Sequence, residues 1–158
     1  MIDIAEKVKN IDVTNLMTKR VITVSDNQPL QEASKLMYQN NIGSIIILKS
    51  NDETESESVP IGIVTERDIA RIVGFASTFS PTMPISEVMS KPLLTTTTSS
   101  SLKEAADLMQ QNNIRRLPVL DSKGKLVGVV TAKDILKSTM DILKKIMVEQ
   151  DFMTLHFN

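Results

Sequence analysis

The stretch Gly128-Val129-Val130-Thr131-Ala132-Lys133-Asp134 has a close counterpart at Gly62-Ile63-Val64-Thr65-Glu66-Arg67-Asp68. In each stretch, β-branched residues typical of a strand reach a Thr and pass at once into residues that favour a helix. Such a junction brings together the free backbone N–H groups of a helix start, a hydroxyl and a carboxylate. The sequence therefore predicts two equivalent strand–helix junctions.

The two junctions belong to a longer internal repeat. The tetrapeptide Gln39-Asn40-Asn41-Ile42 recurs as Gln111-Asn112-Asn113-Ile114, and the offset of 111 − 39 = 72 also relates Met17 to Met89. The Thr-x-x-Asp stretches differ by 131 − 65 = 66, because the loop before them is shorter in the second copy. Two copies of this length indicate a duplicated module with pseudo-twofold symmetry.

The periodicity of apolar residues predicts the same elements in each copy. In the first copy these are a helical turn at 13–17, strands at 21–24, 44–48 and 61–64, and helices at 29–40 and 65–73. In the second copy they are a turn at 85–89, strands at 93–95, 116–120 and 126–130, a helix at 101–111 opened by a capping box, and a helix from 131 to about 149. Residues 49–60 and 96–100 are predicted to be loops, and the apolar tail at 152–158 is expected to pack against another surface.

These elements predict an α+β fold of two β-α-β-β-α repeats, related by a pseudo-twofold axis and packed through their sheets. The expected divisions are an N-terminal helix at 1–12, a first repeat at 13–73, a connector at 74–84, a second repeat at 85–140, and a C-terminal helix and tail at 141–158.

Composition narrows the class of function. The chain has 158 residues, a net charge of −1 and 3% aromatic residues, which argues against nucleic-acid binding. No apolar run approaches the roughly 18 residues of a membrane span, so no membrane contact is expected. There is no Cys, which is consistent with a cytoplasmic protein and excludes thiolate chemistry.

Conventional catalytic and metal sites are not evident. The single His156 has no partner at the spacing of a metal site or a catalytic triad. Neither of the standard glycine-rich phosphate loops occurs. The chain is therefore expected to have no enzymatic activity, no metal site and no required cofactor.

The Thr-x-x-Asp junctions support two interpretations. Thr at the N-cap with Asp three residues later is a capping pair, which stabilises a helix by about 1 kcal/mol without any ligand. A carboxylate at this place is also an acceptor that can take both hydroxyls of a ribose diol. Nearby cations favour the ligand-binding interpretation. Arg115-Arg116 stands where the first copy has Gly43-Ser44. Lys133 and Arg67 occupy the same position at a helix start, where a cation without a bound anion is unfavourable.

The sequence resembles a tandem pair of CBS domains, often called a Bateman module, over about residues 10–140. The residues that carry the resemblance are Leu16-Met17-Thr18, Val88-Met89-Ser90, Asn113-Ile114-Arg115-Arg116-Leu117-Pro118-Val119-Leu120-Asp121 and both Gly-x-x-Thr-x-x-Asp motifs.

The resemblance implies two related ligand sites in a cleft between the copies. It implies that Asp68 and Asp134 hold ribose hydroxyls, with Thr65 and Thr131 near the ribose or phosphate. The adenine pockets would be lined by Thr18 and Ile22 and by Ser90 and Leu94, the latter two being expected to complete the Gly128–Asp134 motif. Phosphates would be met by Arg115 and Arg116, so the phosphate-facing chemistry is expected mostly in the second copy, and the two affinities are expected to differ.

The implied function is a regulatory sensor of AMP, ADP, ATP or another adenosyl compound. No catalytic domain is expected beside the pair, so the effector would be a separate protein or the chain's own oligomer. Members of the family commonly form homodimers, and the early helix and the tail at 146–157 are candidate contacts. The alternatives are a constitutive interaction or dimerisation module without ligand, and a weak nucleic-acid binder.

Overall fold

The computed structural model describes residues 11–50, 59–75 and 79–156, with the side chains of the last helix described as far as Val148. The predicted helix at 1–12 and most of the loop at 49–60 lie outside the described residues. The elements follow in the order η1 (Val13–Asn15), β1 (Thr23–Ser25), α2 (Leu30–Gln39), β2 (Ser44–Leu48), β3 (Pro60–Thr65), α3 (Glu66–Phe75), η3 (Ile85–Glu87), β4 (Thr96–Thr97), α4 (Leu102–Gln111), β5 (Arg116–Leu120), β6 (Leu126–Thr131) and α5 (Ala132–His156).

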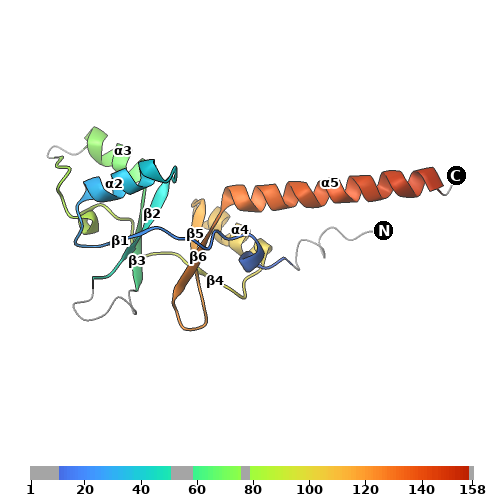
Figure 1. Ribbon diagram of the computed structural model, residues 1–158, viewed down its shortest axis with the longest axis horizontal. Coiled ribbons are helices and arrows are strands. Elements are labelled where there is room, and N and C mark those ends of the chain that lie inside the picture. Colours follow the sequence, from blue (N-terminus) through green and yellow to red (C-terminus); the bar gives the residue numbers. More distant parts are fainter. Residues whose placement is uncertain (1–10, 51–58, 76–78, 157–158) are drawn as a thin grey trace. The chain divides into compact units, whose positions relative to one another are not determined.

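Each copy contains a three-stranded sheet, with the orders β1-β2-β3 and β4-β5-β6 (Figure 1). The first two strands of each sheet are parallel, since a helix connects them: Thr23 lies opposite Ile46, and Thr96 lies opposite Val119. β2 and β3 are antiparallel, with Ser44 opposite Thr65. The α+β class and the β-α-β-β-α order predicted from the repeat are confirmed.

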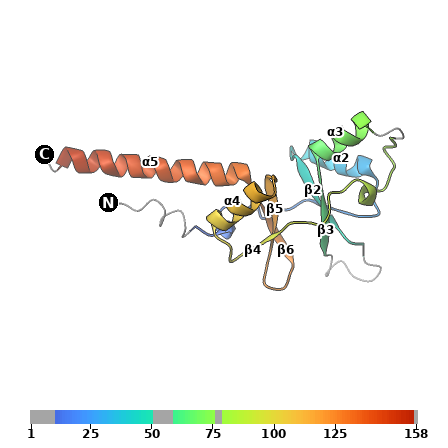
Figure 2. The same cartoon turned by 180° about the vertical axis from the view of Figure 1, so that it is seen from behind.

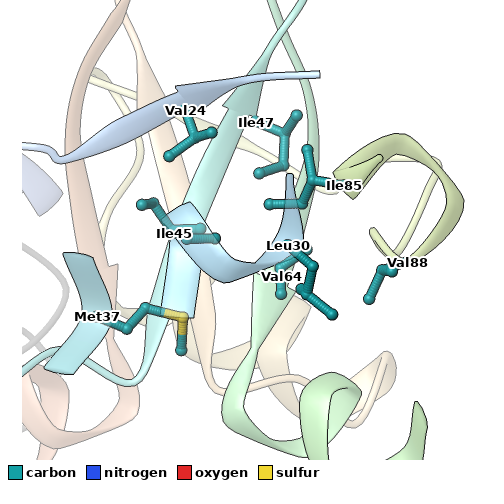
Figure 3. Close-up of a cluster of buried hydrophobic side chains, with 9 residues drawn as sticks. Val24, Leu30, Met37, Ile45, Ile47, Val64, Ile85 and Val88 are labelled. Atoms are coloured by element: carbon teal, nitrogen blue, oxygen red, sulfur yellow. The ribbon is translucent and has the colours of Figure 1, made fainter. Parts of the chain in front are cut away.

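The strands and helices of the first copy bury one apolar cluster. Val24, Ile45 and Ile47 point from β1 and β2 toward Leu30 and Met37 of α2 (Figure 3). The spacing of the buried α2 residues Leu30, Ala33 and Met37 is that of one helix face, which explains why the segment folds as an amphipathic helix. The equivalent cluster of the second copy is formed by Val13, Ala105, Met109, Leu117, Val119 and Val130.

The two short helices are exchanged between the copies. Ile85 of η3 and Val88, which follows η3, come from the second copy and belong to the core of the first. Val13, from η1 of the first copy, belongs to the core of the second. The chain accordingly forms two compact units. The first unit contains Arg20–Leu94 and Lys123–Leu126, and the second unit contains the segment ending at Lys19, Thr95–Ser122 and the segment beginning at Val127.

Backbone hydrogen bonds secure both exchanged segments. In the first unit the Ile85 N–H donates to the Gln28 carbonyl at 2.9 Å. In the second unit the Val13 N–H donates to the Ser100 carbonyl at 3.0 Å. Each core is therefore completed by a segment that is distant in sequence.

Two predicted strands are displaced along the chain. The strand expected at 21–24 is found at Thr23–Ser25, and the one expected at 93–95 is found at Thr96–Thr97, within a predicted loop. Thr96 is 7% exposed and stands at the position of Val24, which is 6% exposed, as the offset of 96 − 24 = 72 requires. The strand β4 therefore forms at the position that the repeat predicts, where it pairs with β5, although the Thr- and Ser-rich composition of this segment is typical of a loop.

The capping box predicted for α4 is confirmed. The Glu104 N–H donates to Oγ of Ser101, and the Ser101 N–H donates to the Glu104 carboxylate at 2.7 Å. The hydrogen bonds from the Ser101 N–H and hydroxyl hold the pKa of Glu104 below its ordinary value.

The last helix is longer than predicted. It continues from Ala132 to His156, beyond the end expected near Glu149, because no Gly or Pro interrupts the sequence between those residues. Figure 2 shows α5 extending well past the sheet of its own unit. Within the described residues, no helix is both long and apolar enough to span a bilayer.

Candidate functional site

Both Thr-x-x-Asp junctions have the hydrogen bonds of a capping pair. The Thr131 N–H and hydroxyl donate to Oδ2 of Asp134 at 2.9 and 2.6 Å, and the Asp134 N–H donates to Oγ1 of Thr131 at 3.3 Å. The Thr65–Asp68 pair has the same three bonds at 2.9, 2.7 and 3.2 Å. The cap uses one oxygen of each carboxylate, so the cap does not exclude a ligand at the other oxygen.

The remaining oxygens of the two carboxylates differ. Oδ1 of Asp68 accepts a hydrogen bond from the Ser90 hydroxyl at 3.2 Å and lies 3.6 Å from Nη2 of Arg71. Within the described part of the chain, Oδ1 of Asp134 has no hydrogen-bond or ion-pair partner. The fold is duplicated, but the surroundings of the two acidic groups are not.

The residues that precede the first strands are exchanged along with the short helices. The Thr18 N–H donates to the Val129 carbonyl at 2.9 Å, and the Val129 N–H returns a bond to the Thr18 carbonyl at 3.0 Å. Ser90 pairs in the same way with Ile63, at 2.8 and 3.3 Å. The prediction that Ser90 completes the motif at Gly128–Asp134 is wrong: Ser90 contacts Asp68, because η3 packs in the first unit.

We therefore define a first site, formed by Thr65, Asp68 and Ser90, and a second site, formed by Thr131, Asp134 and Thr18. Both Thr18 and Ser90 are exposed, whereas the motif Thr and Asp residues are partly buried. Each site thus combines a hydroxyl from one copy with a carboxylate from the other.

The glycine of each motif is required by the exchanged segment. A Cβ atom at Gly128 would lie 2.5 Å from Sδ and 2.9 Å from Cγ of Met17, and a Cβ atom at Gly62 would meet Met89 at the same two distances. Met17 and Met89 immediately precede Thr18 and Ser90. The absence of a side chain at the glycine therefore allows the exchanged segment to approach the motif strand.

The predicted cations lie near both motifs. Arg115 is exposed and Arg116 is partly buried, and the Arg115 carbonyl accepts the N–H of Ala132, beside the second motif, at 2.9 Å. In the first copy the Gly43 carbonyl accepts the Glu66 N–H in the same way, at 3.3 Å. Lys133 is exposed on the first turn of α5.

Sequence reasoning missed one cation at the first site. Arg71 lies one helical turn after Asp68 and, with Arg67, Asp68, Ala70 and Phe75, lines a hollow of about 480 Å³. The i, i+3 spacing of Asp68 and Arg71 was the available signal, but such pairs are common on helix surfaces. Positive charge is therefore present beside the first motif as well as the second.

The two predicted apolar contacts have different surroundings. Ile22 packs against the core of the first unit, and Leu94 is 36% exposed. Both residues belong to the first unit, which also contains Asp68 and Ser90. Among the described residues, no cluster of three His, Cys, Asp or Glu side chains could hold a metal ion.

Comparison with known proteins gives a consistent result. The family model for the CBS domain matches residues 9–74 and 85–141. The CBS domain-containing protein YhcV of Bacillus subtilis is 40% identical over 128 residues, which are 81% of this chain and 85% of that protein. The uncharacterised protein MJ1404 of Methanocaldococcus jannaschii is 35% identical over 153 residues, but this chain spans only 35% of its length.

A solved structure shares the fold. The CBS domain pair of protein MJ0100, determined in complex with 5′-methylthioadenosine and S-adenosyl-L-methionine, is 27% identical to this chain. The TM-score is 0.68, and the match covers 80% of this chain and 93% of that one.

Proposed function

The chain belongs to the CBS-domain family, and we propose that it is a regulatory module that binds an adenine nucleotide or another adenosyl compound at its two Thr-x-x-Asp motifs. The observation that carries the proposal is the arrangement of the motif carboxylates. The capping bonds occupy Oδ2 of Asp134 and leave Oδ1 as an acceptor for a ligand, and the exposed Thr18 pairs with the motif strand at Val129.

A ribose suits this acceptor. A carboxylate accepts hydrogen bonds only, and its second oxygen can take two donors, which is what a vicinal diol supplies. Lys133, Arg115 and Arg116 add positive charge in the same unit, which favours an anionic substituent on the ribose. The ligands named for the MJ0100 pair share an adenosyl group, which supports the same class here.

Thermal unfolding can test whether the chain binds adenosyl compounds through their ribose diol. AMP, ADP, ATP, 5′-methylthioadenosine and S-adenosyl-L-methionine are each added to the chain, and at least one is expected to raise the melting temperature. A ligand selective for the native state at about 100 times its Kd stabilises it by about 2.7 kcal/mol, or several degrees for a protein of this size. The matched 2′,3′-dideoxy compound is expected to give a much smaller shift. Equal shifts from both compounds, or none from any ligand, would contradict the proposal.

We also propose that the partner of α5 is a second copy of the chain. Leu136, Met140, Leu143 and Met147 follow one another at spacings of four, three and four residues, and they are 63%, 46%, 38% and 65% exposed. Alternating spacings of three and four residues form the apolar seam of a helix pair. Of the predicted contact segment at 146–157, only Met147 belongs to this stripe, and side chains beyond Val148 lie outside the described residues.

Sedimentation equilibrium is expected to give twice the chain mass of 17.5 kDa. Replacing both Met140 and Leu143 by Lys is expected to give the monomer, since two charges on one seam oppose helix pairing. The exposed Lys145, off this stripe, supplies the control, and Lys145→Ala is expected to remain dimeric. A wild-type monomer at micromolar concentration would contradict the proposal.

A further inference from the structure

The carboxylate of Asp68 is almost fully engaged by the protein itself. A carboxylate offers about four positions for donors, two on each oxygen. The Thr65 N–H and hydroxyl take two positions on Oδ2, and the Ser90 hydroxyl takes a third on Oδ1 at 3.2 Å. The guanidinium of Arg71 faces the same oxygen at 3.6 Å. A ribose diol, which needs two positions, therefore has to displace these groups from Oδ1.

Asp134 is engaged at only one oxygen. The Thr131 N–H and hydroxyl take the two positions on Oδ2, and no other described group bonds to the carboxylate. The offset of 66 places Lys137 where the first copy has Arg71, and no ion pair within 4 Å joins Lys137 to Asp134. Thr18 stands where the first site has Ser90, and its hydroxyl makes no bond to Asp134.

We propose that Arg71 and Ser90 hold the first site closed, so that the second site binds the adenosyl ligand first and more tightly. This inference rests on the proposed function, since it ranks the two sites at which the ligand binds. Arg71 acts through Asp68 and is a positioning residue, which competes with the ribose for Oδ1. The two motifs, which share the pattern Gly-x-x-Thr-x-x-Asp, thus form one site that binds tightly and one that binds weakly.

The Arg71 side chain can leave Asp68 without a large rearrangement. It is 63% exposed, and it borders the hollow lined by Arg67, Ala70 and Phe75. Because the Arg71 end of the pair is exposed to solvent and only the Asp68 end is largely buried, the pair is weak, and its competition with the ligand is expected to change affinity by about fivefold or less. A ribose diol can therefore displace Arg71 from Asp68.

The test uses adenosine, because a neutral ligand cannot pair with Arg71 through a phosphate. In an Asp134→Asn background, which leaves the first site, calorimetry is expected to give a Kd about two- to fivefold lower when Arg71→Gln is added. Raising the salt concentration is expected to tighten adenosine binding in the parent and not in the Arg71→Gln variant, because salt screens the ion pair. The matched change Lys137→Gln, in an Asp68→Asn background, is expected to leave the Kd unchanged.

The outcomes separate this inference from the proposed function. An unchanged or higher Kd for adenosine in the Arg71→Gln variant overturns the inference and leaves the function in place. If the Arg71→Gln variant has a higher Kd for AMP and an unchanged Kd for adenosine, the inference is also overturned, since Arg71 would then bind phosphate. Absence of binding by the wild-type chain overturns the proposed function, and the ranking of the sites with it.

Discussion

Replacing Asp134 by Asn is expected to weaken adenosine or AMP binding at the second site by about tenfold or more. The carboxylate loses its charge and one acceptor oxygen, and a hydrogen bond to a charged group contributes about 1.5–3 kcal/mol. The amide oxygen of Asn can still accept from the Thr131 N–H and hydroxyl, so most of the helix cap is retained. The loss of stability is accordingly expected to stay within about 1 kcal/mol. Calorimetric titration and thermal unfolding measure the two effects separately.

The control for this change is Asp141→Asn, which removes an exposed carboxylate from the same helix. It alters the net charge of the chain by the same amount and is expected to leave ligand affinity unchanged. Asp68→Asn is expected to have a smaller effect on the tighter binding step than Asp134→Asn. If Asp134→Asn and Asp141→Asn have the same affinity, the carboxylate of Asp134 does not hold the ligand.

Replacing Gly128 by Ala is expected to destabilise the fold by about 1–3 kcal/mol, the usual cost of an overpacked contact. The new Cβ would lie 2.5 Å from Sδ of Met17 and 3.2 Å from its Cβ, so the side chain cannot avoid the clash by moving its end alone. The exchanged segment has to shift, and the Thr18–Val129 pairing shifts with it. The expected result is a melting temperature lower by several degrees, with weaker ligand binding at the second site.

Two further variants separate this clash from a general effect of alanine. Gly74 lies in α3, and a Cβ atom added there would meet no atom within 4 Å beyond its own helix backbone and chain neighbours. Gly74→Ala is therefore expected to be neutral or mildly stabilising. Combining Gly128→Ala with Met17→Ala is expected to cost less than the sum of the single changes, since the two groups compete for one space. Strict additivity would show that Met17 is not the group that Gly128 accommodates.

The duplicated sequence predicted most of the fold. Helices such as α2 and α4 were found within a residue or two of their expected bounds, because their apolar faces recur at helical spacing and Ser101 marks a start. The strand β4 was predicted a few residues too early, because Thr96 is a polar residue whose burial depends on pairing with Val119. The local sequence pattern therefore predicted elements whose buried residues are apolar, and it misplaced the strand whose position depends on pairing with a distant strand.

The composition of each site was harder to predict than the motif. The Thr-x-x-Asp pairs form the predicted cap, but their spacing does not say which copy supplies the adjacent hydroxyl. That choice depends on the packing of η1 and η3, whose contacts join residues far apart in the chain, such as Thr18 with Val129. The role of Arg71 was missed for a related reason: its distance from Asp68 is set by side-chain geometry that an i, i+3 spacing allows but does not require.

The most direct test is calorimetric titration of the wild-type chain and of the Asp68→Asn, Asp134→Asn double variant with AMP, adenosine and S-adenosyl-L-methionine. The wild-type chain is expected to bind at least one of them saturably, in a tighter and a weaker step. The double variant is expected to retain its fold and to lose both steps. Undiminished binding by the double variant, or no saturable binding of any adenosyl compound by the wild-type chain, would contradict the assignment of the two carboxylates as ribose-binding groups.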